Sequence, residues 1–488
     1  MSNKHRFGST RFAAIAMGMS IWLLATATPR AADTASAGAA SRPNVLYIIA
    51  HDLGYCLGCY GDPVVKTPNL DRLAAEGARC SQYFCAATAC SPSRGCIMTG
   101  RYAHTTGLIG LANAWGRWWH LPDSERTIVD YLSDAGYYTA NFGGDHERGP
   151  NGYHYQQRGI PSRRKADQMA DDVCAFLKSY DPKNGPFYVN AYSQDPHAPW
   201  NRPEFLGRYD PDKIRVPAFL PNIAAVRKEL AAFYGAMSFT DEALGRIFDT
   251  LRQTGLHRNT LVIFTTDHGI GFPRAKPTLY DPGLTTAVIL RWPGHIRPGT
   301  VVTHLLSNVD LLPTELELLG LPVPKPVQGR SFAGVLVGDR YVPRKEIFAE
   351  RNYHDDYDPM RCVRTTRYKL IRNYAQMNDF KHPAEATEKD TLGELFRHPS
   401  DRPRPYEELY DLQKDPNEFH NLAADPACAP VLHDLRQRLE RWMNETGDFL
   451  RGAGDFDYFP AKKARPAKSG PATRPKKAAE AAKSGPSE

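Results

Sequence analysis

Continuous apolar runs alternate with amphipathic segments through the first part of the chain. The runs have the length and composition of strands that are buried on both faces, and the segments between them have the periodicity of helices. This alternation predicts a large, mostly parallel sheet sandwiched by helices. The predicted strands are residues 44–50, 137–143, 187–193, 260–267 and 286–292, and the predicted helices are residues 67–79, 127–136, 166–180 and 241–255.

The pattern changes after residue 345. Residues 361–374 predict a β-ribbon, and residues 408–423 predict a strand followed by a loop. Farther on, apolar side chains recur on one helical face, at Val431, Leu432, Leu435, Leu439 and Trp442. We therefore expect an α/β chain with a large domain at residues 42–345 and a smaller C-terminal α+β subdomain at residues 346–460.

The two ends of the chain differ in composition from the body. Residues 1–27 begin with basic residues, continue with an apolar run and end in a small-x-small site, which together predict a secretory signal peptide. The apolar run is short for a membrane span, so we expect no stable anchor after cleavage; an uncleaved anchor is the alternative. Residues 28–41 are predicted to be a linker, and residues 461–488 a disordered basic tail. The protein is expected to be exported, either periplasmic or secreted.

The formal net charge of +7 comes from these two ends. The tail carries eight Lys or Arg residues and two Glu, and the signal segment carries three basic residues and no acidic one. The body between them is slightly acidic, so we expect no binding to nucleic acid.

Acidic residues and histidines occur together where four predicted strands end. The groups are His51-Asp52, Asp145-His146, Asp195-Pro196-His197 and Asp267-His268. One such group is usually a helix cap or the polar end of a strand. Four groups indicate a site, because ligands bind beyond the carboxyl ends of the strands in open α/β sheets. Clustered carboxylates and imidazoles are suitable ligands for a divalent cation.

Cys90 opens the segment CSPSRG, which is predicted to begin a helix near that edge of the sheet. A thiol beside an arginine at a helix N-terminus suggests a nucleophile of low pKa. A structural disulfide is the alternative, because an exported protein meets an oxidising environment. The chain has nine cysteines, and its sequence does not decide how the other eight pair.

The segment CSPSRG, followed by MTGRY, resembles the signature of the sulfatases, a family of the alkaline-phosphatase-like superfamily. The resemblance covers nearly the whole mature chain, including HDLGYCLGCYGDPVVKTPNLDRLAAEG, TTDHGIGFPRAKPTLYDPG and ELYDLQKDPNEFHNLA. Several segments look most like those of the sulfamidases, or heparan N-sulfatases. The resemblance implies an alkaline-phosphatase-like fold and a sulfohydrolase acting on sulfated glycans, with N-sulfoglucosamine of heparan- or heparin-type saccharides as the leading substrate.

The resemblance also implies a nucleophile and a metal site. A maturation enzyme of the family oxidises the signature cysteine to formylglycine, whose hydrate is the nucleophile, and Cys90 matches that cysteine. Calcium would be bound by Asp52, Asp267, His268 and the modified Cys90. His51 departs from the family pattern, which has an acid at that position. Its nitrogen suits calcium less well and a transition metal better. Alternatively, His51 could contact the metal ligands without binding the ion itself.

Four further residues match catalytic positions of the family. Arg94 would steady the hydrate, and His146 would be the base that triggers sulfate release. His197 and Lys276 would bind the sulfate and protonate the leaving group. Gly144 departs from the pattern, because the family commonly has a lysine there that faces the sulfate. Lys276 and Arg94 are expected to supply the charge instead.

The substrate is expected to contact a segment near the end of the large domain. The resemblance implies that the substrate pocket is lined by residues that recognise the sugar, namely His354, Asp355 and Asp356. Three alternatives to N-sulfate hydrolysis stay open: an O-sulfate ester hydrolase on other polysaccharides, a phosphoester or phosphonate hydrolase of the same superfamily, and a non-catalytic glycan binder. The intact motif argues against the binder, because a binding module has no use for a modification motif.

Overall fold

The computed structural model describes residues 42–112, 119–148, 154–379, 381–397, 400 and 402–452. The predicted signal peptide, linker and basic tail lie outside these residues. Within them, no helix is both long enough and apolar enough to cross a lipid bilayer.

An eight-stranded, mostly parallel sheet forms the centre of the fold, as predicted. β1 (Asn44–Ala50) lies between β6 (Phe187–Ser193) and β7 (Thr260–Thr266), and all three strands are parallel. Almost all of their residues are buried, because helices cover both faces of the sheet. The strand order is β5-β4-β6-β1-β7-β8-β2-β9, where the outer strands are β4 (Tyr138–Phe142), β5 (Gln157–Arg158), β8 (Val288–Arg291), β2 (Ala78–Cys80) and β9 (Thr300–Val302).

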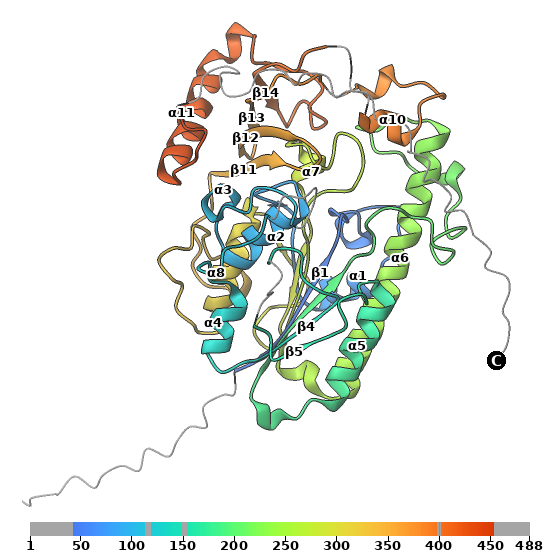
Figure 1. Ribbon diagram of the computed structural model, residues 1–488, viewed down its shortest axis with the longest axis vertical. Coiled ribbons are helices and arrows are strands. Elements are labelled where there is room, and N and C mark those ends of the chain that lie inside the picture. The colour runs from blue at the N-terminus through green and yellow to red at the C-terminus, as the bar shows by residue number, and fades with distance from the viewer. Residues whose placement is uncertain are drawn as a thin grey trace, which may run out of the picture. The chain divides into compact units, whose positions relative to one another are not determined.

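Two groups of helices cover the two faces of this sheet (Figure 1). Along β1, Leu46 and Ile48 belong to one core while Val45 and Ile49 belong to the other, because side chains of a strand alternate between its faces. The first face carries α1 (Pro68–Glu76), α5 (Ala166–Ser179) and α6 (Ala224–Gln253). The second face carries α2 (Cys90–Thr99), α4 (Ile128–Asp134), α8 (Leu311–Leu318) and α9 (Ala333–Val337).

Two details of this architecture differ from the expectation. α6 begins at Ala224, well before the predicted start at residue 241. No side chain caps this helix at Ile223, so its true start carries no sequence signal. The second detail is β8, which pairs antiparallel with β7 and so interrupts the parallel arrangement towards that edge of the sheet.

A second, antiparallel sheet follows in the C-terminal part of the chain. One face packs against α11 (Ala429–Glu445), whose Leu435, Leu439 and Trp442 are buried there, as the periodicity predicted. The other face packs against the segment around α7 (Asp281–Leu284). The four strands are β11 (Glu346–Tyr353), β12 (Tyr357–Thr365), β13 (Tyr368–Asn373) and β14 (Glu407–Asp411).

Short elements complete the fold: α3 (Ala103–Thr106), α10 (Leu392–Arg397), β3 (Tyr83–Phe84) and β10 (Leu306–Ser307).

Candidate active site

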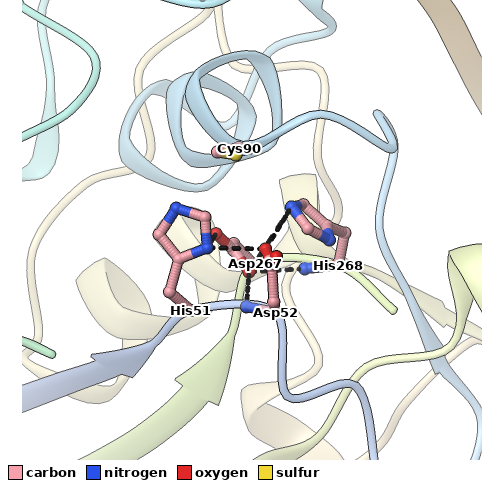
Figure 2. A group of neighbouring side chains, drawn as sticks. All are labelled: His51, Asp52, Cys90, Asp267 and His268. Atoms are coloured by element: carbon pink, nitrogen blue, oxygen red, sulfur yellow. Dashed lines mark hydrogen bonds and ion pairs between the residues drawn. The ribbon is translucent and has the colours of Figure 1, made fainter. Parts of the chain in front are cut away.

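Five side chains that could hold a metal ion meet beyond the carboxyl ends of β1 and β7 (Figure 2). The two strands are adjacent and parallel, with Ala50 opposite Thr266, so the residues that follow them emerge at one place. Each of the five residues is buried, and their ligand atoms all lie within 4.8 Å of one another. The residues are His51, Asp52, Cys90, Asp267 and His268.

The backbone at these strand ends orients the two carboxylates. Asp52 has a φ of 56°, a conformation that costs energy in a non-glycine residue and is common at functional sites. Its N–H donates to Asp267 Oδ1 at 3.0 Å, and the N–H of His268 donates to the same oxygen at 3.0 Å. Asp267 Oδ1 is therefore occupied, and its other oxygen is available to a ligand.

Two of these residues have a buried side-chain atom that makes no hydrogen bond within the described residues and could bind a cation. Asp267 Oδ2 and His268 Nε2 are buried and have no hydrogen-bond partner within the part of the chain that the structure describes. An unsatisfied buried polar atom costs about 1–3 kcal/mol, so such atoms usually contact an ion or water. His51 Nδ1 also lies at this point, 3.4 Å from Asp267 Oδ2, but it is hydrogen-bonded to Asp52 Oδ1 at 2.6 Å. These residues fit a divalent cation.

Cys90 is the first residue of α2 and faces this cluster (Figure 2). The start of the helix is tied to the end of β7, because the Ser93 hydroxyl donates to the backbone carbonyl of Asp267. Asn308 Nδ2 in turn donates to Ser93 Oγ at 2.9 Å. These bonds hold residue 90 over the carboxylates of the strand ends.

The thiol of Cys90 does not have the low pKa that the sequence alone suggested. Burial raises its pKa to about 12, and this effect outweighs the ammonium of Lys276, which lies 3.2 Å from the sulfur. The disulfide alternative is not seen either, since all nine cysteines, which lie in the described ranges, are free thiols. A neutral, buried thiol is a poor nucleophile.

Lys276 brings a positive charge into the site. Its Nζ donates to both oxygens of Asp52, at 2.9 and 3.1 Å. Burial acts to lower the pKa of Lys276, but Asp52 and Cys90 outweigh it and raise that pKa overall. Burial acts to raise the pKa of Asp52, but Lys276 and the neighbouring histidines outweigh it, so that pKa is lowered. The two groups form a buried ion pair.

The C-terminal sheet anchors the loop that carries Lys276. Lys369 Nζ lies 2.6 Å from Asp281 Oδ1 and 2.7 Å from Glu418 Oε1. The N–H of Asp281 donates to Glu418 Oε2 at 2.6 Å, and Arg274 Nη2 donates to the Glu418 carbonyl at 3.0 Å. Because Lys369 and Glu418 are buried, the C-terminal part of the chain helps to position Lys276.

Arg94 is paired with Glu147, a residue that the sequence analysis missed. Arg94 Nε donates to Glu147 Oε2 at 3.2 Å, and both side chains are buried. The guanidinium also lies 4.1 Å from the centroid of the Tyr192 ring. Glu147 Oε2 accepts a second hydrogen bond, from the N–H of His146 at 2.5 Å. Glu147 therefore orients two predicted catalytic residues, and its only sequence signal is its place directly after His146.

The imidazoles of His146 and His197 both lie beside His51. Their ring centroids are 5.8 and 4.5 Å from that of His51. The side chain of His197 is 35% exposed, and its Nε2 lies 3.7 Å from Asp52 Oδ2, so it connects the cluster with the solvent. Burial lowers the pKa of His146 well below its usual value, which keeps this ring neutral and able to accept a proton.

Two acids at the predicted strand ends point elsewhere. Asp145 forms an ion pair with Arg158. Asp195 accepts the N–H of Ala166 at 3.0 Å, at the start of α5, and pairs with Arg202 at 3.1 Å. These are the ordinary roles of a strand-end acid, so Asp145 and Asp195 do not join the cluster.

His354, Asp355 and Asp356 lie in the turn between β11 and β12. His354 Nδ1 lies 3.0 Å from Asp355 Oδ2, and the His354 N–H donates to the Asp356 carbonyl at 3.3 Å. Burial lowers the pKa of His354, and the charge of Lys276 acts in the same direction. The side chain of His354 is 16% exposed and that of Asp355 is 71% exposed, so this turn combines a mostly covered imidazole with a carboxylate in solvent.

Two protein-family models match the chain. The model described as Sulfatase matches residues 43–321. The model described as N-sulphoglucosamine sulphohydrolase, C-terminal, matches residues 271–398.

Several curated proteins are similar over most of the chain. The N-sulphoglucosamine sulphohydrolase of Homo sapiens is 31% identical over 468 residues, which cover 84% of this chain and 91% of that protein. Arylsulfatase A of Homo sapiens is 31% identical over 453 residues, covering 81% and 86%. An ulvan-active sulfatase of Formosa agariphila is 28% identical over 457 residues, covering 83% and 76%.

Solved structures share the fold. The structure of BT4656 in complex with its substrate D-glucosamine-2-N,6-O-disulfate has a TM-score of 0.66 at 21% identity, covering 84% of this chain and 99% of that one. A phosphonate monoester hydrolase from Silicibacter pomeroyi also has a TM-score of 0.66, at 20% identity, covering 84% and 96%.

Proposed function

The chain belongs to the sulfatase family, whose members hydrolyse sulfate esters or sulfamates, and on that premise we propose that it removes N-sulfate from N-sulfoglucosamine of heparan- or heparin-type saccharides. One observation carries the proposal: residues 271–398 match the C-terminal model of N-sulphoglucosamine sulphohydrolase. That region contains Lys276, beside Cys90, and the turn at His354. The match thus covers groups that would meet the substrate.

Asp52, Asp267, His268 and residue 90 would hold the divalent cation that members of the family generally bind, with His51 beside them. When bound, this ion would withdraw charge from the sulfate oxygens and lower the pKa of the nucleophile. Calcium is the ion that we propose, from the family pattern. The two imidazoles make the site less selective for calcium than an all-oxygen site would be, because nitrogen suits transition metals better.

The nucleophile of this proposal is a formylglycine hydrate at residue 90. A maturation enzyme would convert Cys90, removing two electrons and replacing the sulfur by an oxygen, so an oxidant must be supplied with that enzyme. Water then adds to the aldehyde and leaves two hydroxyls on one carbon. They would stand where Sγ now lies, next to Lys276 and the carboxylates.

Three proton transfers would accompany cleavage. One hydroxyl of the hydrate loses its proton to solvent water and attacks sulfur, the S–N bond breaks, and His197 protonates the leaving amine. The second hydroxyl then gives its proton to the neutral His146, the carbon–oxygen bond to sulfate breaks, and the aldehyde re-forms. Arg94 and Lys276 would stabilise the negative charge that develops on the hydrate and on the sulfate oxygens.

Hydrolysis of an O-sulfate ester on another polysaccharide is the second candidate. The similarity to arylsulfatase A and to ulvan-active sulfatase favours it. An alkoxide leaving group needs the same proton as an amine, so His197 and Lys276 would serve both reactions.

A comparison of two sugars tests the proposal. Matured protein is incubated with terminal N-sulfoglucosamine and with 6-O-sulfated N-acetylglucosamine, and released sulfate is measured. We expect kcat/KM to be about 100-fold higher for the N-sulfated sugar. Release from the O-sulfated sugar alone would contradict the N-sulfatase assignment and support the second candidate. Cleavage of a phosphodiester in place of both would support the phosphoester alternative.

The proposal includes a location and two partners. Residues 1–27 would direct export, so the reaction would take place in the periplasm or outside the cell. The partners would be the sulfated saccharide and the maturation enzyme.

A further inference from the structure

The space beside Gly144 contains a positive charge that comes from another segment. Gly144 has a φ of +100°, and a Cβ built on it would lie 3.4 Å from Nε and 3.8 Å from Cζ of Arg164. The guanidinium of Arg164 therefore lies at the position from which a side chain of residue 144 would extend. Gly144 itself follows β4 and stands two residues before His146.

The backbone places Arg164 against the strand end that carries His197. The carbonyl of Arg164 accepts the N–H of Gln194 at 2.8 Å, and Gln194 directly follows β6. The next residue, Lys165, lies 3.5 Å from Asp195 through Nζ. The segment before α5 is thus fixed to the same loop that leads to His197.

The charge of Arg164 has no acidic partner in the described part of the chain. Its Nε donates to the carbonyl of Pro161 at 2.7 Å, and no ion pair involves its guanidinium. The neighbouring Arg163 differs, since its Nε pairs with Asp172 at 3.0 Å. Arg164 is half-buried and so keeps a guanidinium with terminal nitrogens that can meet a ligand.

Arg164 acts electrostatically on the same side chain as the reacting groups do. Burial raises the pKa of Tyr192, while Arg94 and Arg164 both act to lower it. Cys90 also contributes to that shift. The ring of Tyr192 stacks under the Arg94 guanidinium, so the field of Arg164 reaches the wall of the active site.

We infer that Arg164 binds the anionic group of the substrate in the active site and supplies the positive charge that Gly144 lacks. The inference rests on the proposed function, because it assigns the sulfate of the sulfated saccharide as the bound group. A guanidinium binds a sulfate through two parallel N–H donors, which gives both charge and orientation. Gly144 has a left-handed backbone at which any side chain would be strained, so in this conformation residue 144 cannot supply the charge itself.

Binding of inorganic sulfate to the metal-loaded protein tests this inference. Isothermal titration calorimetry is carried out on wild type, Arg164→Ala and Arg164→Lys, with Arg163→Ala as a control that removes the same charge from the adjacent position. We expect Arg164→Ala to weaken sulfate binding by about 10–100-fold, Arg164→Lys to restore part of it, and Arg163→Ala to change it less than about twofold. Thermal melting of each variant verifies that it is folded.

Three results would overturn the inference. The first is that Arg164→Ala binds sulfate as tightly as wild type. The second is that Arg163→Ala loses as much sulfate affinity as Arg164→Ala. The third is that the wild-type protein binds no sulfate. The measurement does not depend on turnover. If N-sulfoglucosamine is not cleaved and Arg164→Ala still loses sulfate affinity, the proposed substrate fails while the role of Arg164 stands.

Discussion

The ammonium of Lys276 lies 3.2 Å from the sulfur of Cys90. The same ammonium contacts both oxygens of Asp52, so one buried cation connects Cys90 with the carboxylate that follows β1. A thiol in this position is held neutral by burial and has no direct use as a nucleophile.

Active protein should carry formylglycine at position 90. Peptide mass spectrometry of the isolated protein measures the conversion, and protein expressed without a maturation enzyme should be unconverted and inactive. Cys90→Ala should keep the fold but lose activity by about a thousandfold or more, because no nucleophile remains. Full activity in protein with an unmodified thiol would show that the nucleophile lies elsewhere.

Asp267→Asn should lose bound metal and activity together. The substitution keeps the size of the side chain but removes the charge of Oδ2, which is aimed at the cluster. Metal content measured by mass spectrometry should fall by about tenfold or more. Asp145→Asn is the matched control, because this strand-end acid pairs with Arg158 outside the cluster and should keep both properties. Retention of metal in Asp267→Asn would mean that the cation site is wrongly placed.

His51→Asp should change the preference among metals. Its Nδ1 lies 2.6 Å from Asp52 Oδ1, and replacing it by a carboxylate adds an oxygen donor and a negative charge to the cluster. We expect affinity for calcium relative to manganese or zinc to rise by about tenfold. Competition titrations measure this ratio independently of turnover. An unchanged ratio would place His51 outside the set of ligands.

Glu147→Gln should lower kcat/KM by about 10–100-fold, since it leaves Arg94 buried without its counter-charge. If Glu147 had a purely structural role, the substitution would lower stability and leave kcat/KM unchanged. The double variant Arg94→Gln/Glu147→Gln distinguishes the two roles. It should be more stable than Glu147→Gln, because no buried charge is left unpaired, but its kcat/KM should stay at least as low. Wild-type kcat/KM in Glu147→Gln would remove Glu147 from the site.

Glu315 should make the protein less stable as the pH rises. It is buried in α8, and burial raises the pKa of its carboxyl from 4.5 to about 8. Between these values the unfolded chain has released the proton while the folded chain retains it, so the free energy of unfolding falls with increasing pH. Below about pH 4.5 both states hold the proton and the penalty disappears.

Glu315→Gln should therefore stabilise the protein at pH 8 by one to a few kcal/mol, in order of magnitude, and have little effect at pH 4.5. Denaturant unfolding at the two pH values measures the difference. Glu317→Gln, an exposed neighbour on the same helix, is the control and should show no such pH dependence. Equal effects of the two substitutions would contradict the assignment.

The local pattern of the sequence was sufficient for the strands and for much of the site. β1 and β6 have the predicted bounds, because a buried strand between two helical layers requires a continuous apolar run. Cys90 begins α2 as expected. Where β1 and β7 end, both the acid and the histidine join the cluster, because parallel neighbours deliver their final residues to one edge.

Tertiary structure decided what no local pattern records. Asp145 and Asp195 carry the same strand-end signal as Asp267, yet Arg158 and the start of α5 bind them instead. Glu147 pairs with Arg94, and the guanidinium of Arg164 lies beside Gly144, so both contacts join segments that are separate in the sequence.

The direction of the Cys90 pKa was likewise set by burial, which depends on how α2 packs over the sheet. The physical reason is the same in each case. Hydrophobic periodicity and strand ends are properties of consecutive residues, whereas ion pairing and desolvation depend on which distant groups the fold brings within a few ångströms.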